Sequence, residues 1–507
     1  MIDLLPALPR GSVLNVSLQL YRIAVCVTAS LAALTGSVLS VTTWTQLFIY
    51  GYLTVFSIGI VAFGALATRR LLLVAISSLL AVPLFIRFGG SAIVGMPETS
   101  SARISGQTLP VVTILCLVVL ARVAVGRMRG NIESVPRGAL DPFIAVFSVI
   151  VGVGAAYGLL RWQNPLTTLY AIQTIAPFAG YVVARRLLVD EADVRRAWNC
   201  ILAGAGISAV VLLANEVSMR PIWALFNEPI HGRVGLLNIY QANDYLPFLW
   251  AFIFVASSPL VLHPVTLNPR LAGALGLIGI CVGALYARGA LLLLMVGLAI
   301  VIAASPQLWR TRRHVVIMLA AALVGVTAFA ASPAGVRLRD RTTALVSGNP
   351  VGSLIVDEAS LRDRFFSMRV VVGYVGARPI FAAGFTPVPP QDLSRRIASL
   401  PPRQLFPAHN QYLDVALRGG LPLLFVFLVL LGMTLYRASL AIRAAQTLFG
   451  RLFATGVAIA LVMTVALGNM YEQNHIQPFT GFFLWFVAGS IEVLLRRNHT
   501  DPATCAS

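Results

Sequence analysis

Long apolar stretches recur along almost the whole chain, and this feature most constrains what it folds into. Hydrophobic residues make up 58% of the 507 residues and charged residues only 11%, whereas soluble domains carry about 25% charged residues. These charged residues are too few to cover the surface of soluble domains of this length. The composition therefore argues against a cytosolic enzyme, a disordered chain or a small disulfide-rich module. The pattern predicts an all-α, polytopic helical membrane protein.

About 14 apolar segments are long enough to be transmembrane helices. The predicted spans are residues 20–40, 46–68, 71–87, 107–126, 139–160, 166–184, 198–214, 245–263, 271–287, 289–305, 315–332, 420–436, 450–469 and 477–494. An even number of spans places both termini on the same side of the membrane. We expect a multi-pass membrane protein with both termini in the cytoplasm.

The basic residues support this orientation. All 38 are arginines, against 19 acidic residues, and with a cytoplasmic N-terminus most of the arginines in short loops fall in inner loops, as the positive-inside rule requires. The absence of lysine excludes a Schiff base and a Walker A phosphate loop. The arginines are scattered between apolar segments, which makes nucleic-acid binding a poor interpretation.

One long connection, residues 333–409, lies outside in this topology. It holds ten arginines and five acidic residues, and a loop of this length within a compact protein is usually functional. Its segment 359–376 has the apolar spacing of a helix, so we expect a periplasmic loop that carries short helices.

Metal and disulfide chemistry are not expected. The five cysteines include no CxxC pair, four of them lie in apolar segments, and no D-x-D pair occurs in the predicted outer loops. Hard divalent cations need such carboxylate ligands, and structural zinc usually needs paired cysteines. We therefore predict no metal and no cofactor.

His409 is the strongest catalytic candidate. It lies in PAHNQYLDVALRGGLP, where Asn410 is a suitable N-cap for a short helix over 411–418 that Gly419-Gly420 ends. The positive end of that helix favours an anionic ligand and a neutral imidazole, the form that a general base needs. The alternative is an interfacial histidine that only caps a turn.

Two arginines are further candidates. Arg288 interrupts apolar sequence at the predicted outer membrane face, where a charge needs a partner or a function. Its alternative is a snorkelling side chain between two helices. The outer loop 215–244 adds Arg233 and Asn243, although each of these is more often structural than catalytic.

Several stretches, taken in order, resemble the O-antigen ligase and polysaccharide polymerase family of membrane glycosyltransferases. The resemblance covers roughly residues 230–435. It is carried by NIYQAND (238–244), ARGAL (287–291), ARPIFAAGF (377–385) and the outer His409-Asn410 pair followed by Gly420.

The resemblance implies inverting, metal-independent transfer of a glycan from undecaprenyl pyrophosphate at the periplasmic face of the bacterial inner membrane. It implies that His409 is the general base and that Arg288 stabilises the pyrophosphate leaving group. Arg233, Asn243, Asn410 and Tyr412 are the predicted substrate-binding residues. The implied partners are the lipid-linked glycan donor, an acceptor that is lipid A–core or a lipid-linked glycan, and membrane lipids, with no nucleic acid.

The sequence leaves the acceptor open between an O-antigen ligase, a polymerase and a protein O-oligosaccharyltransferase. A transporter or glycolipid flippase is the alternative from another class, disfavoured because the charged candidates gather at the outer face and no repeated halves occur. The predicted organisation is an N-terminal transmembrane bundle (1–230), a catalytic region (231–435) and C-terminal helices with a short cytoplasmic tail (436–507).

Overall fold

The structure is a computed structural model. It describes residues 69–81, 122, 137–163, 166–218, 250–251, 253–254, 257, 296–297, 300, 368–385, 410–465 and 478–500. The chain divides into two compact units, one of Met1–Leu73 with Pro110–Pro136 and one of Val74–Leu109 with Arg137–Ser507. Except for part of α3, every helix described below belongs to the second unit.

The described residues are helical, and no β-strand occurs among them, which confirms the predicted all-α class for this part of the chain. The elements are α3 (Arg69–Ala81), α7 (Asp141–Trp162), α8 (Leu166–Ile175), the 3₁₀ helix η1 (Ala176–Phe178), α9 (Ala179–Leu187), α10 (Glu191–Ser218), a helix at Met368–Ala377, α19 (Gln411–Ala444), α20 (Leu448–Met463) and α22 (Pro478–Thr500).

Two of these helices are long and apolar enough to cross a membrane, judged by length and composition. They are Asp141–Arg161 within α7 and the whole of α19. Both coincide with predicted spans, 139–160 and 420–436. Of the other predicted spans, 198–214 lies within α10 and nearly all of 477–494 lies within α22, and the total of about 14 is not tested because other spans lie outside the described residues.

One predicted span is not a continuous helix. Residues 166–184 were expected to cross in one piece, but α8 ends at Ile175 and the chain passes through η1 before α9 begins. The physical reason is Pro177, which lacks a backbone N–H and cannot continue the α-helical hydrogen-bond ladder. Its carbonyl accepts a hydrogen bond from the N–H of Ala179, which tightens the turn.

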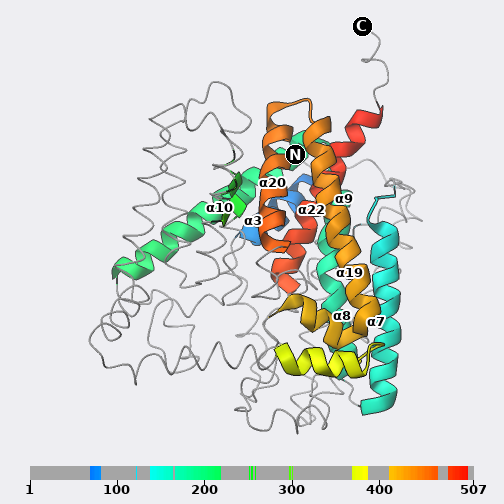
Figure 1. Ribbon diagram of the computed structural model, residues 1–507. Helices are drawn as coiled ribbons and strands as arrows, with labels where there is room; N and C mark the ends of the chain where they lie inside the picture. The colour runs from blue at the N-terminus through cyan, green and yellow to red at the C-terminus, as the bar shows by residue number, and fades with distance from the viewer. Residues whose placement is uncertain are drawn as a thin grey trace, which may run out of the picture. The chain divides into compact units, whose positions relative to one another are not determined.

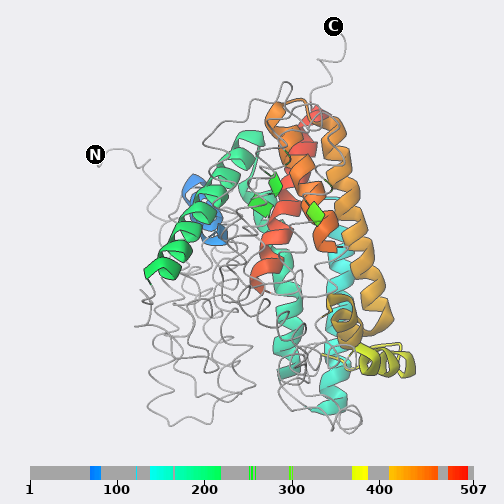
Figure 2. The same cartoon turned by 60° about the vertical axis from the view of Figure 1, so that its left-hand side comes forward.

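The helices of the second unit pack into a bundle in which α7 and α20 run opposite to α9, α19 and α22 (Figure 1). Helix α9 packs along α22, and α19 packs between α7 and α20 (Figure 1). The same arrangement is visible from a second direction (Figure 2). As a result, the start of α7, the end of α9 and the turn between α19 and α20 lie at one end of the bundle.

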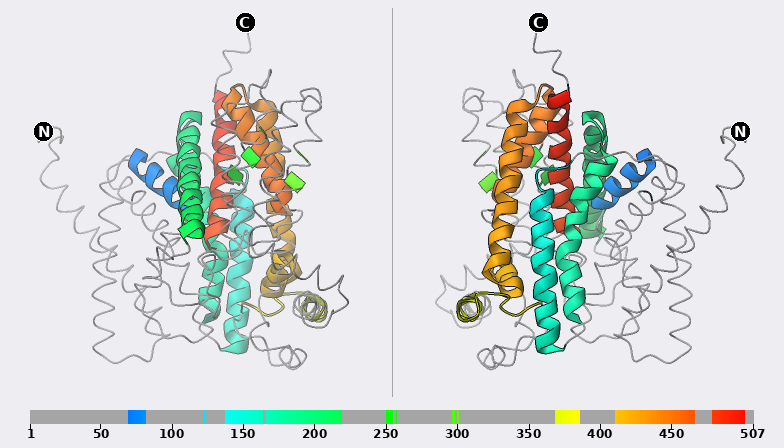
Figure 3. Two further views of the ribbon diagram at one scale, coloured as in Figure 1. Left: turned by 90° about the vertical axis from the view of Figure 1, so that its left-hand side faces the viewer. Right: turned by 90° about the vertical axis from the view of Figure 1, so that its right-hand side faces the viewer.

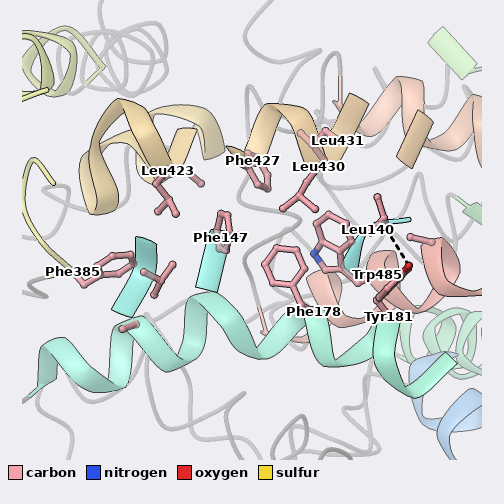
Figure 4. Packing of buried hydrophobic residues seen from close by; sticks show 14 of the residues in the cluster. Leu140, Phe147, Phe178, Tyr181, Phe385, Leu423, Phe427, Leu430, Leu431 and Trp485 are labelled. Carbon is pink, nitrogen blue, oxygen red and sulfur yellow. Dashed lines mark hydrogen bonds between the residues drawn. The ribbon is translucent and has the colours of Figure 1, made fainter. Parts of the chain in front are cut away.

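An aromatic cluster fills the centre of this bundle. Phe147 of α7 lies 5.0 Å from Phe178 and 6.3 Å from Phe427 of α19, measured between ring centroids, and Phe178 lies 4.5 Å from Trp485 of α22 (Figure 4). Such ring pairs add about 0.5–1.5 kcal/mol each beyond their buried area. The cluster joins helices that are far apart in the sequence.

Ion pairs and polar contacts gather at one end of the bundle. Arg437 of α19 makes a bidentate pair with Glu492 of α22, with N–O distances of 2.7 and 2.8 Å. Arg185 of α9 pairs with Asp141 of α7, and Thr447 donates a hydrogen bond to Glu191. This is the end that the predicted topology assigns to the arginine-rich cytoplasmic loops.

At the opposite end, α7 approaches a loop segment closely through Gly158. A Cβ on Gly158 would overlap the carbonyl oxygen of Gly384, whereas a Cβ on Gly152, two turns earlier, would meet nothing within 4 Å. Gly158 is buried and Gly152 is exposed.

We therefore expect Gly158→Ala to lower the free energy of unfolding by about 1–3 kcal/mol, because the backbone of Gly384 must move. Gly152→Ala is the matched control and should be neutral or stabilising by up to about 1 kcal/mol through helix propensity. The apparent Tm of the two purified variants in one detergent, at one scan rate, checks this. Equal Tm values would contradict the close approach.

Candidate active site

The helix that follows His409 begins as the sequence predicts. Asn410 has extended backbone dihedrals, and its side-chain oxygen accepts a hydrogen bond of 3.1 Å from the N–H of Leu413. This satisfies one of the backbone donors that a helix start leaves unpaired. The predicted role of Asn410 as an N-cap is confirmed, and the first turn of α19 has a defined place.

The same helix ends at Gly420. Its φ of 75° and ψ of −173° are not helical, and they divide α19 into a short helix from Gln411 and a long helix that continues to Ala444. This conformation is essentially restricted to glycine. The predicted short helix and its glycine terminus are both confirmed.

The segment 377–385 closes the end of the short helix through backbone hydrogen bonds. Ala383 N–H donates to the carbonyl of Leu417 at 2.9 Å, and Phe385 N–H donates to the carbonyl of Arg418 at 3.2 Å. In return, Leu421 N–H donates to the carbonyl of Pro379 at 2.8 Å. The last carbonyls of a helix have no partner within it, so this segment acts as its C-terminal cap. We call this contact the Gly420 junction.

The junction segment adopts a strained turn that is packed on α7. Phe381, Ala382, Gly384 and Phe385 all have positive φ, which is rare for bulky residues. Phe385 is 1% exposed and lies against Gly154 of α7, where a Cβ would be 3.0 Å from its ring. Burial of Phe385 on a glycine face of α7 therefore holds the strained turn in place.

A polar chain not predicted from the sequence runs through the short helix. Arg418 Nε lies 2.8 Å from a carboxylate oxygen of Asp414, which is 2% exposed. The Nη1 atom of Arg418 donates a 3.1 Å hydrogen bond to the hydroxyl of Thr174 on α8. The i, i+4 spacing of Asp414 and Arg418 could have indicated their ion pair. The contact of Arg418 with α8 joins residues far apart in the sequence, and no local pattern indicates it.

Tyr412 is half-buried and anchored. Its hydroxyl donates a hydrogen bond to the carbonyl of Val465, just beyond α20, and its ring lies 6.3 Å from that of Phe427. These contacts orient the first turn of α19 against α20. The predicted substrate contact of Tyr412 stays a prediction, and its observed partners give it a positioning role.

Of the six predicted site residues, the structure therefore places Asn410 and Tyr412, both on the first turn of α19. His409, Arg288, Arg233 and Asn243 lie outside the described residues. Asn410 is directly bonded to His409 in the chain, so the capped helix start is the nearest described feature to the predicted general base. Within the described ranges, no three His, Cys, Asp or Glu side chains converge, and no metal ligand is assigned there.

One region of the chain matches a known protein family. Residues 273–428 match the family described as O-Antigen ligase, Wzy_C, which confirms the resemblance predicted from the sequence motifs. The matched region contains Arg288, the junction segment 377–385, His409 and Gly420, and it begins after Arg233 and Asn243. A search of curated proteins finds no match for the chain.

The close contacts at Gly420 predict that adding one methyl group at this position destabilises the protein. A Cβ at position 420 would lie 2.5 Å from both Phe381 N and Pro379 O, and the required φ is unfavourable for alanine, so Gly420→Ala should cost about 1–3 kcal/mol. Faster hydrogen–deuterium exchange in peptides covering 378–385 and 417–421 is expected.

Gly432→Ala is the matched control on the same helix, because a Cβ there meets nothing within 4 Å. Its exchange should equal that of the unmodified protein. Unchanged exchange in Gly420→Ala would show that the junction tolerates a side chain and does not hold the helix end.

Proposed function

We propose that this protein is a membrane glycosyltransferase acting on a lipid-linked glycan, because residues 273–428 match the O-antigen ligase family. The donor is a glycan on undecaprenyl pyrophosphate, and transfer takes place at the periplasmic face of the bacterial inner membrane. The observation that carries the proposal is the family match over the region that contains Arg288 and His409.

The proposed reaction is an inverting displacement. An acceptor hydroxyl attacks the anomeric carbon of the donor, the bond from that carbon to the pyrophosphate oxygen breaks, and the pyrophosphate departs with the bonding electrons. His409 takes the proton from the attacking hydroxyl as general base. Arg288 stabilises the charge that develops on the leaving group. The scheme needs no metal, and Arg233, Asn243, Asn410 and Tyr412 orient the substrates.

The described framework supports a general base at position 409. Asn410 caps the helix through Leu413 N–H, and the Gly420 junction closes its other end. Partial positive charge at the helix start favours a neutral imidazole and a nearby phosphate.

The proposed topology has about 14 spans, both termini in the cytoplasm and one long periplasmic loop, 333–409. The ion pairs of Arg437 with Glu492 and Arg185 with Asp141 lie at the end assigned to the cytoplasm. The Gly420 junction lies at the other end. Along the sequence, the proposed catalytic region 231–435 follows the N-terminal transmembrane bundle 1–230 and precedes the C-terminal helices and tail 436–507.

The proposed acceptor is lipid A–core or a lipid-linked repeat unit, and protein is the alternative acceptor. With lipid A–core as acceptor the protein is an O-antigen ligase, and with a lipid-linked repeat unit it is a polymerase of O-antigen or exopolysaccharide. Deleting the gene distinguishes a ligase from a polymerase. Loss of capped lipid A–core with intact lipid-linked polymer identifies a ligase, and accumulation of single repeat units identifies a polymerase. Unchanged surface glycans would contradict both.

Complementation of the deletion strain tests the general base. His409→Ala should lower transfer by about 10²–10⁴-fold, because the hydroxyl then loses its proton acceptor, and the membrane level of the protein should stay unchanged. His314→Ala, at a histidine assigned to the cytoplasmic side, is the control and should restore the glycan fully. Near-normal transfer by His409→Ala would remove its proposed role.

Arg288→Lys tests the leaving-group contact. A lysine keeps the charge but lacks the planar fork that binds two phosphate oxygens, so transfer by purified protein should fall by about 10²–10³-fold. Arg310→Lys, in a predicted inner loop, should have no effect. Equal activity of the two lysine variants would indicate that Arg288 only snorkels to the interface.

A further inference from the structure

The helix Met368–Ala377 lies across the end of the bundle, at the Gly420 junction. It lies across the direction of the long part of α19, since Figure 1 shows it from the side and Figure 3 shows it end-on beside upright α7 and α19. Its inner face is packed, because Val371, Tyr374 and Val375 are buried with Ala416 and Leu417 of the short helix. A helix in this position is parallel to a membrane surface that α19 crosses.

The outer face of this helix is unusual for a surface that faces water. Its exposed residues are Arg369, Val372, Gly373, Gly376 and Ala377. They include one charge and no other polar side chain, and Val372 is 56% exposed. A water-facing helix usually presents several charged or polar side chains, so this face fits the boundary between headgroups and acyl chains.

The same apolar surface continues onto α19. Ile380, three residues after the helix, is 63% exposed, and the Leu421 N–H donates to the carbonyl of its neighbour Pro379. Leu421, Phe425 and Leu428 are 48%, 67% and 47% exposed. Their i, i+4, i+7 spacing puts them on one side of the helix. The exposed strip thus passes from Val372 through Ile380 to the face that a spanning α19 turns toward lipid.

We propose that Met368–Ala377 and Ile380 form an interfacial anchor, embedded in the phospholipids of the leaflet on the junction side. Val372 and Ile380 enter the upper acyl region, and Arg369 reaches lipid phosphates. The proposal rests on the membrane placement in the proposed function. Lipid is the proposed partner of this surface because the exposed strip continues into the surface of α19, which is apolar over the length of a span.

The anchor has a consequence for catalysis. The helix is joined to the junction segment through Arg378, whose N–H donates to Tyr374 O at 3.1 Å and whose Nη1 donates to the Tyr374 hydroxyl at 2.5 Å. The junction in turn caps the helix that begins at Asn410. Fixing the anchor at the headgroup level therefore fixes the depth of that helix, next to the level at which a lipid-linked diphosphate lies.

Site-directed spin labelling tests the anchor. In a variant whose native cysteines are replaced and which retains transfer activity, Val372→Cys, Phe425→Cys and Gln446→Cys are labelled separately in nanodiscs of phosphatidylethanolamine and phosphatidylglycerol. Relaxation by oxygen should exceed relaxation by a water-soluble nickel chelate at positions 372 and 425. The reverse is expected at Gln446, which is exposed in the turn between α19 and α20.

The outcomes separate the anchor from the membrane placement. Lipid exposure at 372 and 425 supports the anchor. Nickel access at 372 with lipid exposure at 425 overturns the anchor and leaves the proposed function intact. Nickel access at both positions overturns the membrane placement as well. Low access to both reagents at 372 overturns the lipid anchor, because a second copy or another protein then covers the face.

A second measurement does not need replacement of the cysteines. Benzoylphenylalanine introduced at position 372 of the otherwise unchanged protein should form phospholipid adducts on irradiation, as it should at position 425, and not at position 446. Adducts at 425 without adducts at 372 would contradict the anchor.

Discussion

The arrangement of the described site depends on the carbonyl groups that the short helix leaves unpaired at Gly420. Burying such groups without partners costs about 1–3 kcal/mol each. Here Ala383 and Phe385 supply the donors from a segment that lies some 35 residues earlier in the chain. This requirement links two separate stretches of the sequence, ARPIFAAGF and the glycine pair, since each completes the hydrogen bonding of the other.

The junction also explains why α7 has glycines at positions 154 and 158. Phe385 and Gly384 can approach α7 only where that helix has no side chain, at Gly154 and Gly158. The positive φ angles of the turn carry a conformational cost, and burial of the Phe385 ring offsets it, since burying a large apolar side chain stabilises by about 1.5–3 kcal/mol. A strained loop is thereby converted into a rigid support.

Local features of the site could be predicted from the sequence, and long-range ones could not. Asn410, the short helix and Gly420 follow from capping and backbone preferences that act within a few residues, and the structure confirms them. The helix within 359–376 follows from apolar spacing and is observed at Met368–Ala377. The break at Pro177 was missed because hydropathy averages over a window and ignores a single lost N–H.

The long-range contacts of the site depend on packing. The bond from Arg418 to Thr174 and that from Tyr412 to Val465 join residues whose proximity no local pattern encodes. The predicted proximity of His409 and Arg288 is likewise not encoded by a local pattern, because the two residues are more than 100 positions apart in the sequence and a predicted span lies between them. Family resemblance supplied that expectation, whereas periodicity and capping did not.

Helix α19 connects the site with the charged end of the bundle. Arg437 lies 17 residues after Gly420, or about 26 Å along the helix axis, and it makes a partly buried bidentate pair with Glu492 of α22. Breaking this pair leaves the buried Glu492 carboxylate without its partner, which is unfavourable. A slip of α19 by one turn, about 5.4 Å, would break this pair and the Gly420 junction together. These two contacts at opposite ends of one helix therefore fix its register, and with it the position of the helix start at Asn410.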